Sequence, residues 1–384
     1  MSRNDFLVEI HAGAHERNYC PIQLGQIEAT YGTELHLHSS KRETIVAQPL
    51  RNGTAVAILP HIGATETGRY TLSTATDSGE ATNLRTEDNG IDTISVYEND
   101  ILITSYRYNN VEARPYFFPV NEPGGICVTR SYPMQSIGHE TADHPHHRSI
   151  WIAHGDVNGA DNWSEEPGHG FTAHQAINWI ENGPVATQFN TTGIWTDVNG
   201  NPLLTQDLTT TFWRSDGVSR IIDFNITLTA DHEVGDVEFG DTKEGGILAV
   251  RVASEMDVTR GGEIRNVYGG INEGECWGKN SHYCCYSSTV ENTSCGISIF
   301  DHPDGFRSPT TWHVRNYGLM TANPFGYSAF THGRVNGSFV LQQGNSLQFK
   351  YRMIVHRDPQ FYSKAAQFYL NYAFPPRVHT HAGV

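Results

Sequence analysis

The sequence predicts an all-β protein built as one large antiparallel β-sandwich with few short helices. Short runs of alternating or continuous apolar residues recur along the chain, and turn-forming residues separate them. The composition agrees, because 37 Gly, 17 Pro, 17 Phe, 17 Tyr and 7 Trp are typical of a turn-rich globular β protein. The sequence shows no internal repeat of solenoid or propeller length.

The N-terminal part of the chain is predicted to form strands on either side of one long loop. Residues 5–60 alternate in short β-like pieces such as Ala55–Leu59. Residues 61–90 are rich in Thr, Ser, Gly and Glu and lack a sustained apolar period, which predicts a surface loop. Two strands follow within residues 93–106, and the sequence Glu98-Asn99-Asp100 between them fits a hairpin turn.

The middle of the chain leads into a predicted buried strand. Residues 108–128 are loop-like and dense in Pro, Asn and Gly. The apolar run Ile150–Ala153 is too short for a typical helix and is bounded by Pro145 and Gly155. This pattern favours a strand that is buried on both faces, although periodicity alone does not exclude a buried helix.

From Gln175 onward the pattern is β again, with a single helix near the end. Strands recur at short intervals and close with residues 338–341 and 347–355. The one good helix candidate is Pro359–Tyr369, which carries two alanines at its centre.

No linker is distinct enough to divide the chain. Its 384 residues suffice for one large domain or two ordinary ones. We therefore expect a single sandwich domain over residues 1–384. Within it, residues 1–105 could form an N-terminal strand layer, and residues 106–384 carry the motifs described below.

Charge and composition exclude several classes of function. The net charge of −16 argues against nucleic acid and against anionic membranes as partners. No apolar stretch approaches the length of a membrane-spanning helix. The start of the chain lacks an apolar core of signal-peptide length, so we expect a cytoplasmic protein, or a secreted or periplasmic one if a leader has been removed. The six scattered cysteines are expected to be reduced, partly buried thiols.

The stretch Asp143–Gly159 gathers four histidines, an arginine, two aspartates and an asparagine around the apolar run. Successive side chains of a strand point to opposite faces, so Arg148 and His154 would share one face. His147 and Trp151 would share the other. Titratable side chains at both ends of a buried strand would lie at the edge of the sheet, where a substrate can reach them. The site candidates in this stretch are His146, His147, Arg148, His154, Asp156 and Asn158.

Two further segments carry similar side chains. Residues 239–251 place charged residues before an apolar strand that ends in an arginine, although a lysine–glutamate pair there could simply be a surface ion pair. Residues 300–318 repeat the Asp-His-Pro sequence of the first stretch and continue into a short strand, whose aromatic residues could also be core. The site candidates in these segments and just beyond them are Lys243, Glu244, Arg251, His302, His313, Arg315, Tyr317 and Asn323.

Histidine and aspartate side chains are both metal ligands and proton carriers. A divalent metal bound by the histidines is therefore one expectation, but no pair has HExxH spacing, so the sequence does not specify a zinc site. Alternatively, single histidines could hydrogen-bond within a packed interior. A purely structural role is less expected for all four histidines together, because burying several imidazoles lowers the stability of the fold.

Three blocks, residues 143–159, 240–251 and 301–326, resemble in their order a bacterial domain-of-unknown-function family that is often labelled methane oxygenase PmoA-like. The resemblance spans residues 110–355. It implies a galactose-mutarotase-like supersandwich and, by analogy with polysaccharide-utilisation proteins, work on carbohydrates. The methane-oxygenase label itself does not fit, because a membrane monooxygenase subunit would need spanning helices and the sequence shows none. The chain departs from the family at Tyr283-Cys284-Cys285-Tyr286, where the family has a Trp-Cys-Asp-Tyr-like segment.

The leading hypothesis is a carbohydrate-active enzyme that cleaves a glycosidic bond as a glycoside hydrolase. The catalytic candidates are His147, His154, Asp156, Glu244 and His313. The substrate-binding candidates are His146, Arg148, Asn158, Lys243, Arg251, His302, Arg315, Tyr317 and Asn323. A polysaccharide lyase is the nearest alternative, because a His–Tyr–Arg cluster without a pair of carboxylates favours elimination.

Two other classes stay open. A non-catalytic carbohydrate-binding module would use Trp and Tyr as stacking platforms, and a metal-dependent oxidoreductase or isomerase would use the histidines. The expected partner is a carbohydrate, without nucleic acid or membrane, and the sequence does not indicate an oligomeric state.

Overall fold

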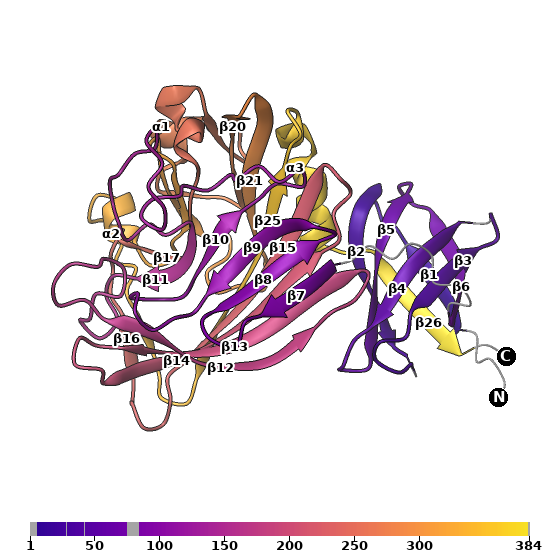
Figure 1. Ribbon diagram of the computed structural model, residues 1–384, viewed down its shortest axis with the longest axis horizontal. Helices are drawn as coiled ribbons and strands as arrows, with labels where there is room; N and C mark the ends of the chain where they lie inside the picture. Colours follow the sequence, from indigo (N-terminus) through magenta and orange to yellow (C-terminus); the bar gives the residue numbers. More distant parts are fainter. Residues whose placement is uncertain (1–5, 28, 42, 75–83, 383–384) are drawn as a thin grey trace.

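Two large antiparallel sheets pack face to face in the computed structural model, which describes residues 6–27, 29–41, 43–74 and 84–382 (Figure 1). In order across the first sheet, the nine strands are β19 (Lys279–Asn280), β22 (Thr311–Arg315), β23 (Leu319–Ala322), β17 (Gly245–Arg251), β11 (Ile150–His154), β10 (Tyr116–Val120), β9 (Ile101–Arg107), β8 (Thr93–Glu98) and β7 (Leu84–Asp88). In order across the second sheet, the eight strands are β12 (Phe171–Glu181), β13 (Ala186–Thr196), β14 (Pro202–Trp213), β15 (Ser219–Thr229), β25 (Ser346–His356), β21 (Thr293–Asp301), β20 (Tyr283–Val290) and β18 (Glu263–Asn266). The strands β16 (Val237–Phe239) and β24 (Phe339–Leu341) form a separate two-stranded sheet.

The main core lies between the two large sheets, because each strand turns every second side chain inward. Ile150 and Ile152 of β11 and Val250 of β17 belong to one continuous apolar cluster with Phe224 and Ile226 of β15. Burial of each such side chain contributes roughly 1.5–3 kcal/mol. The prediction of an all-β fold built on a large antiparallel sandwich with few short helices is confirmed, whereas its galactose-mutarotase-like character stays a prediction.

A third sheet of seven strands lies beside the sandwich and has its own apolar core (Figure 1). In order, its strands are β2 (Arg17–Gln26), β5 (Thr54–Ile62), β4 (Thr44–Pro49), β3 (Leu35–Ser39), β6 (Thr67–Thr74), β1 (Phe6–His11) and β26 (Arg377–Ala382). The last strand of the chain therefore pairs with the first. The strands β7, β8 and β9 belong to the nine-stranded sheet and not to this N-terminal layer, and the single-domain organisation stays a prediction.

The surface loop predicted over residues 61–90 is wrong for residues 67–74, which form β6, and for residues 84–88, which form β7. Likewise, residues 108–128, predicted as loop-like, contain the strand β10. Tyr70 and Leu72 point into the core of the seven-stranded sheet, while their polar neighbours are more exposed. Two apolar residues among Thr, Ser, Gly and Arg are too few to show a period in the sequence. The remaining part of the predicted loop at residues 75–83 lies outside the described residues.

Three α-helices occur in the described residues: α1 (Asn272–Cys276), α2 (Tyr327–Phe330) and α3 (Phe361–Ala373). The predicted helix near the end of the chain is confirmed as α3. It packs Phe361, Ala365 and Phe368 into a cluster that also contains Tyr19 of β2 and Ile221 of β15, so it joins the seven-stranded sheet to the sandwich. Two prolines follow the helix and prevent its continuation.

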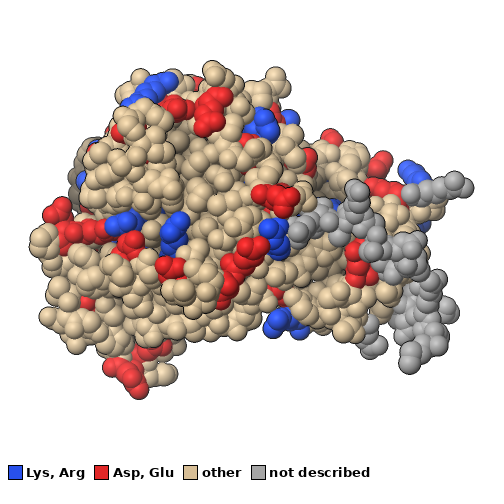
Figure 2. All heavy atoms as spheres, in the orientation of Figure 1, with Lys and Arg blue, Asp and Glu red and all other residues tan. Residues whose placement is uncertain are grey.

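In the described residues, no helix has the length and apolar character that a membrane crossing requires. The six cysteines are all free, and five of them are buried. On the face shown in Figure 2, Lys and Arg side chains are scattered among Asp and Glu and form no continuous basic patch in the described residues.

Candidate active site

The candidate active site lies on the outer face of the nine-stranded sheet. Trp151 of β11 and Leu319 of β23 belong to a small apolar cluster on this face, whereas Ile150 belongs to the main core. Paired residues on neighbouring antiparallel strands point to the same face. Leu319 pairs with both Arg251 and Arg315, so the register places the two arginines on this outer face.

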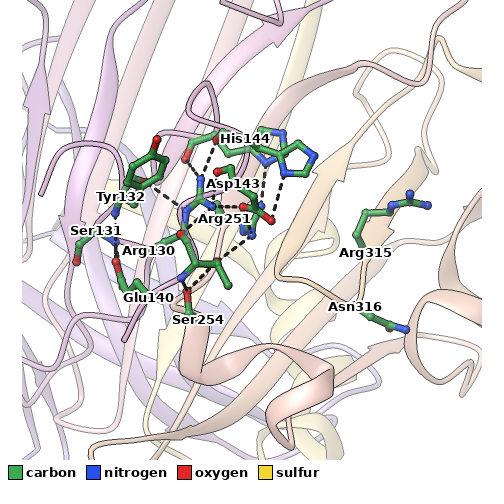
Figure 3. A network of polar contacts seen from close by, with 12 residues as sticks. Arg130, Ser131, Tyr132, Glu140, Asp143, His144, Arg251, Ser254, Arg315 and Asn316 are labelled. Carbon is green, nitrogen blue, oxygen red and sulfur yellow. Dashed lines mark hydrogen bonds and ion pairs between the residues drawn. The ribbon is translucent and has the colours of Figure 1, made fainter. Parts of the chain in front are cut away.

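Buried ionic contacts hold the loop before β11 on this face (Figure 3). The Asp143 carboxylate accepts hydrogen bonds from Arg130 and, at 2.8 Å, from Arg251. Arg130 also donates to the backbone carbonyls of His144 at 2.8 Å and His147 at 3.3 Å. Both guanidinium groups are fully buried. Burial raises the pKa of Asp143, but its hydrogen bond with His144 and the charges of Arg251 and Arg130 outweigh this and lower the pKa well below its usual range. We call these five residues the Asp143 network.

Four aromatic rings stack in a row beside Arg251. The ring centroids are 5.0 Å apart for Tyr317 and His144, 4.8 Å for His144 and His147, and 5.2 Å for His147 and Trp151. The Arg251 guanidinium lies 4.6 Å from the Tyr317 centroid and donates to Nδ1 of His147 at 3.2 Å. Burial holds the pKa of His147 well below its ordinary value, so the ring is neutral and can accept this hydrogen bond.

Arg148, a predicted substrate-binding residue, is committed to an ion pair. Its Nε and Nη2 donate to the two carboxylate oxygens of Glu165 at 3.0 and 2.8 Å, which is the strong bidentate arrangement. Buried Arg114 shares the same carboxylate at 3.4 Å. His146 lies between this ion pair and the row of rings, with its centroid 4.5 Å from that of His147. Burial lowers the pKa of His146 to about 4.

Glu244 and His313 form a candidate acid–base pair. Nδ1 of His313 lies 2.7 Å from the backbone carbonyl of Lys243. Because a carbonyl only accepts, Nδ1 carries the proton and Nε2 is left with its lone pair. Burial lowers the pKa of His313 to about 4. The Glu244 carboxylate is 47% exposed and pairs with the Lys243 ammonium. Burial raises the pKa of Glu244, but the hydrogen bond and charge of Lys243 outweigh this and lower it.

The three motif-bearing segments therefore meet. His144 contacts Tyr317, His147 contacts Arg251, and His313 contacts the backbone of Lys243. The predicted site residues that this face brings together are His146, His147, Arg148, Lys243, Glu244, Arg251, His313, Arg315 and Tyr317. Those that lie elsewhere are His154, Asp156, Asn158 and His302. Asn323 is fully buried directly behind the site, where it shares the Lys243 carbonyl with His313.

The structure places His154 in the sandwich core and not at a rim. The side chain is fully buried, Nε2 bonds the Gly240 carbonyl at 2.9 Å, and the ring centroid lies 4.9 Å from that of Phe325. Asn323 is also structural, because its amide nitrogen donates to the backbone carbonyls of Thr242 and Lys243.

Asp156, Asn158 and His302 also lie outside the candidate active site. Asp156 and Asn158 lie in the turn after β11, where they accept hydrogen bonds from the backbone N–H groups of Gly159 and Glu238. His302 follows β21 of the eight-stranded sheet and packs against Tyr372 of α3 at 4.9 Å. In the described residues, none of these three side chains contacts the side chain of Glu244 or His313.

A His154→Leu variant tests the structural role of His154. Leucine keeps an apolar side chain in the core but leaves the Gly240 carbonyl unpaired, so the free energy of unfolding should fall by about 1–2 kcal/mol. Urea denaturation measures this change. Loss of activity in the folded variant would contradict a purely structural role.

The sequence did not single out Arg130, Arg114, Glu165 or Glu273 as site residues. Arg130 and Arg114 act through loops that fold back on β11, and Glu165 reaches Arg148 only because of that folding. Glu273 of α1 pairs with Arg315 at 2.7 Å across 42 residues of sequence. No local pattern marks these partners.

The described residues contain no group of three or more His, Cys, Asp or Glu side chains placed to hold a metal ion. The histidines of the site stack on one another and on Trp151 and Tyr317 instead. A divalent metal bound by histidines stays a prediction.

Several solved structures resemble the fold at low sequence identity. A protein of glycosyl hydrolase family 38 from Enterococcus faecalis is 10% identical with a TM-score of 0.45, and the match covers 99% of this chain and 47% of that protein. An alpha-mannosidase from E. faecalis V583 is 10% identical with a TM-score of 0.43, over 100% of this chain and 46% of that one. The chain thus spans about half the length of these two proteins.

An aldose epimerase homologue from C. elegans is also 10% identical, with a TM-score of 0.32, over 72% of this chain and 100% of that one. No match was found among the curated proteins. The model of a family of unknown function, DUF6807, matches residues 93–369, which is more than half of the sequence, and the chain belongs to this family.

Proposed function

We propose that the protein is a carbohydrate-active enzyme that cleaves a glycosidic bond, and that the cleavage is an elimination at a uronate residue. The observation that carries the proposal is that Glu244, His313 and Tyr317 lie on one face of the sheet, in environments that favour the protonation states an elimination needs. At neutral pH Glu244 is ionised and His313 is neutral, so both can accept a proton. Burial raises the pKa of Tyr317, although Arg315 and Arg251 oppose this, so its phenol can donate one.

Hydrolysis by paired carboxyl groups makes a different demand. One carboxyl must be protonated at working pH, which requires a raised pKa, and a second must stand free as base or nucleophile. The pKa of Glu244 is lowered. Three other carboxylates on this face, those of Asp143, Glu165 and Glu273, are each bound to an arginine. Burial raises the pKa of a fourth carboxyl, Asp257, to about 6, but the residue is only 3% exposed, which leaves it little access to a substrate. The face is therefore poorly suited to a carboxylate-pair mechanism.

Elimination uses the groups that the face provides. Glu244 would remove the proton from the carbon that bears the uronate carboxylate, with the neutral His313 ring beside it. The electron pair left behind forms a carbon–carbon double bond as the glycosidic carbon–oxygen bond breaks. Tyr317 would return a proton to the leaving oxygen. Arg315, whose guanidinium lies 5.7 Å from the Tyr317 centroid and whose side chain is 34% exposed, would stabilise the negative charge that develops on the carboxylate. Arg251 is fully buried and would act only by holding Tyr317 and His147 in place.

The test is incubation with a panel of polysaccharides, followed by assay of new reducing ends. The proposal predicts cleavage of at least one uronate polymer, such as polygalacturonate, alginate or hyaluronan, and no cleavage of mannan, amylose or unsubstituted xylan. Cleavage of a neutral polymer alone would contradict it. Glycoside hydrolysis, the leading expectation from the sequence, also creates new reducing ends, so the mass of the products must distinguish it from elimination.

A further inference from the structure

A second cleft lies between the seven-stranded sheet and the outer face of the eight-stranded sheet, on different strands from the Glu244–His313 pair. Its volume is about 700 Å³, which is within the usual size range of small-molecule sites. The side chains that matter below are Gln23 of β2, Arg51, Trp179 of β12, Trp213 of β14 and Asn225 of β15. Figure 1 shows the two sheets side by side, with β2 and β5 nearest to the sandwich.

The floor of the cleft is a polar sheet surface. The register places Asn190, Thr209, Asn225 and Lys350 in one row across β13, β14, β15 and β25. The next row holds Gln188, Thr211, Asp223 and Arg352. Paired residues face the same way, so the sheet turns amide, hydroxyl and charged groups toward the cleft.

The two carboxylates of the cleft are already engaged. Asp223 binds Arg352 through both oxygens, at 2.7 and 2.8 Å, and also accepts from the Trp213 indole at 2.8 Å. Glu181 accepts from the backbone N–H of Arg51 and from the Gln188 amide. With both carboxylates committed, the cleft is suited to binding and not to acid–base catalysis.

The two walls are joined by direct hydrogen bonds, so the cleft exists before any ligand arrives. Oε1 of Gln48 accepts from the backbone N–H groups of Val185 and Ala186 at 3.0 and 2.9 Å. The contact between Arg51 and Glu181 is a second link. A preformed site avoids the free-energy cost of ordering its walls on binding.

Two side chains that line the cleft have polar groups that are free to form hydrogen bonds with a ligand. In the described part of the chain, the side-chain amide of Asn225 and the indole N–H of Trp179 have no hydrogen-bond partner, and Asn225 is exposed. An amide both donates and accepts, as a sugar hydroxyl does. The indole rings offer apolar faces beside these polar groups.

We infer that this cleft is a non-catalytic binding site for a neutral oligosaccharide. Neutral amides and hydroxyls next to indole faces match the alternating hydroxyl and C–H surfaces of a sugar chain. The paired carboxylates leave no free anionic group for a cationic ligand. The guanidinium of Arg51, the one cation of the described lining, lies 5.1 Å from the centroid of Tyr31, which is not part of that lining. The inference concerns a different site from the proposed active site and does not depend on the reaction there.

The test is isothermal titration calorimetry of the full chain with cellohexaose, mannohexaose and xylohexaose. At least one should bind, and Trp179→Ala and Asn225→Ala should each weaken that binding, by about tenfold and by about two- to tenfold respectively. Thr227→Ala, on the same face of β15 but outside the cleft lining, is the matched control and should bind like the wild type.

Two further measurements keep the outcome clear. Thermal unfolding shows whether Trp179→Ala is folded, and exposed Asn225 carries the test if it is not. Glu244→Gln should bind the hexasaccharide like the wild type, which separates this site from the proposed active site. Absence of binding by all three sugars, binding that neither cleft variant weakens, or binding that Glu244→Gln abolishes would each overturn the inference.

Discussion

Glu244→Gln should lower kcat/KM by about 10²–10⁴-fold, the usual contribution of a general acid or base. Glutamine keeps the shape of the side chain and can still contact Lys243, but it cannot accept a proton. Because Glu244 is half-exposed and precedes β17, its replacement should leave the fold intact. The measurement is the initial rate on whichever polymer the wild type cleaves.

Glu238→Gln is the matched control for this variant. Glu238 lies in β16 with an exposed side chain, and it sits near Asn158, away from the Glu244–His313 pair. Its replacement should change kcat/KM by less than about twofold. If Glu244→Gln and Glu238→Gln had equal rates, Glu244 would not be the base.

Asp143→Asn should lower the free energy of unfolding by about 3 kcal/mol. The variant leaves Arg130 and Arg251 fully buried without a carboxylate partner, and an uncompensated buried charge typically costs about 3–5 kcal/mol. We expect the low end of this range because the Asp143 carboxylate is itself 39% exposed to solvent. Guanidinium denaturation at neutral pH measures the difference.

The effect of Asp143 should also depend on pH in a defined direction. Its pKa is lower in the folded protein than in the unfolded chain, so its ionised form stabilises the fold above the ordinary carboxyl pKa of about 3.9. That contribution is lost as the pH falls below this value toward the folded-state pKa. Asp304→Asn, whose carboxylate is 68% exposed, is the control and should change stability by less than about 0.5 kcal/mol. An equally small effect of Asp143→Asn would contradict the Asp143 network.

Much of the fold follows from local patterns that the sequence displays. The alternation along β11 correctly grouped His147 with Trp151, whose rings stack at 5.2 Å, and separated them from His154. It wrongly grouped Arg148 with His154, because Ser149, with a positive φ of 57°, breaks the alternation before β11 begins and Arg148 lies over Tyr116 on the outer face. Alternation does not say which face is the core, since that depends on the partner sheet. The sequence therefore predicted both His147 and His154 as catalytic candidates, although His154 packs against Phe325 inside the sandwich.

Long-range pairing could not be read from the sequence. The strand β26 joins β1 across the length of the chain, and nothing local in residues 377–382 indicates that partner. Pairs such as Arg148–Glu165 and Arg315–Glu273 likewise depend on how loops fold back. The resemblance to the PmoA-like family label stays a prediction, as does the assignment of reaction roles to the site residues.

The mass of the products is the most direct test of the reaction that we propose at the outer face of the nine-stranded sheet. Elimination splits the chain without adding water, so the two fragments together weigh as much as the parent chain and one of them carries a carbon–carbon double bond. We predict this result for a uronate oligosaccharide treated with the wild type, and its loss with Glu244→Gln. Fragments that together gain the mass of one water would show hydrolysis and contradict the proposed mechanism.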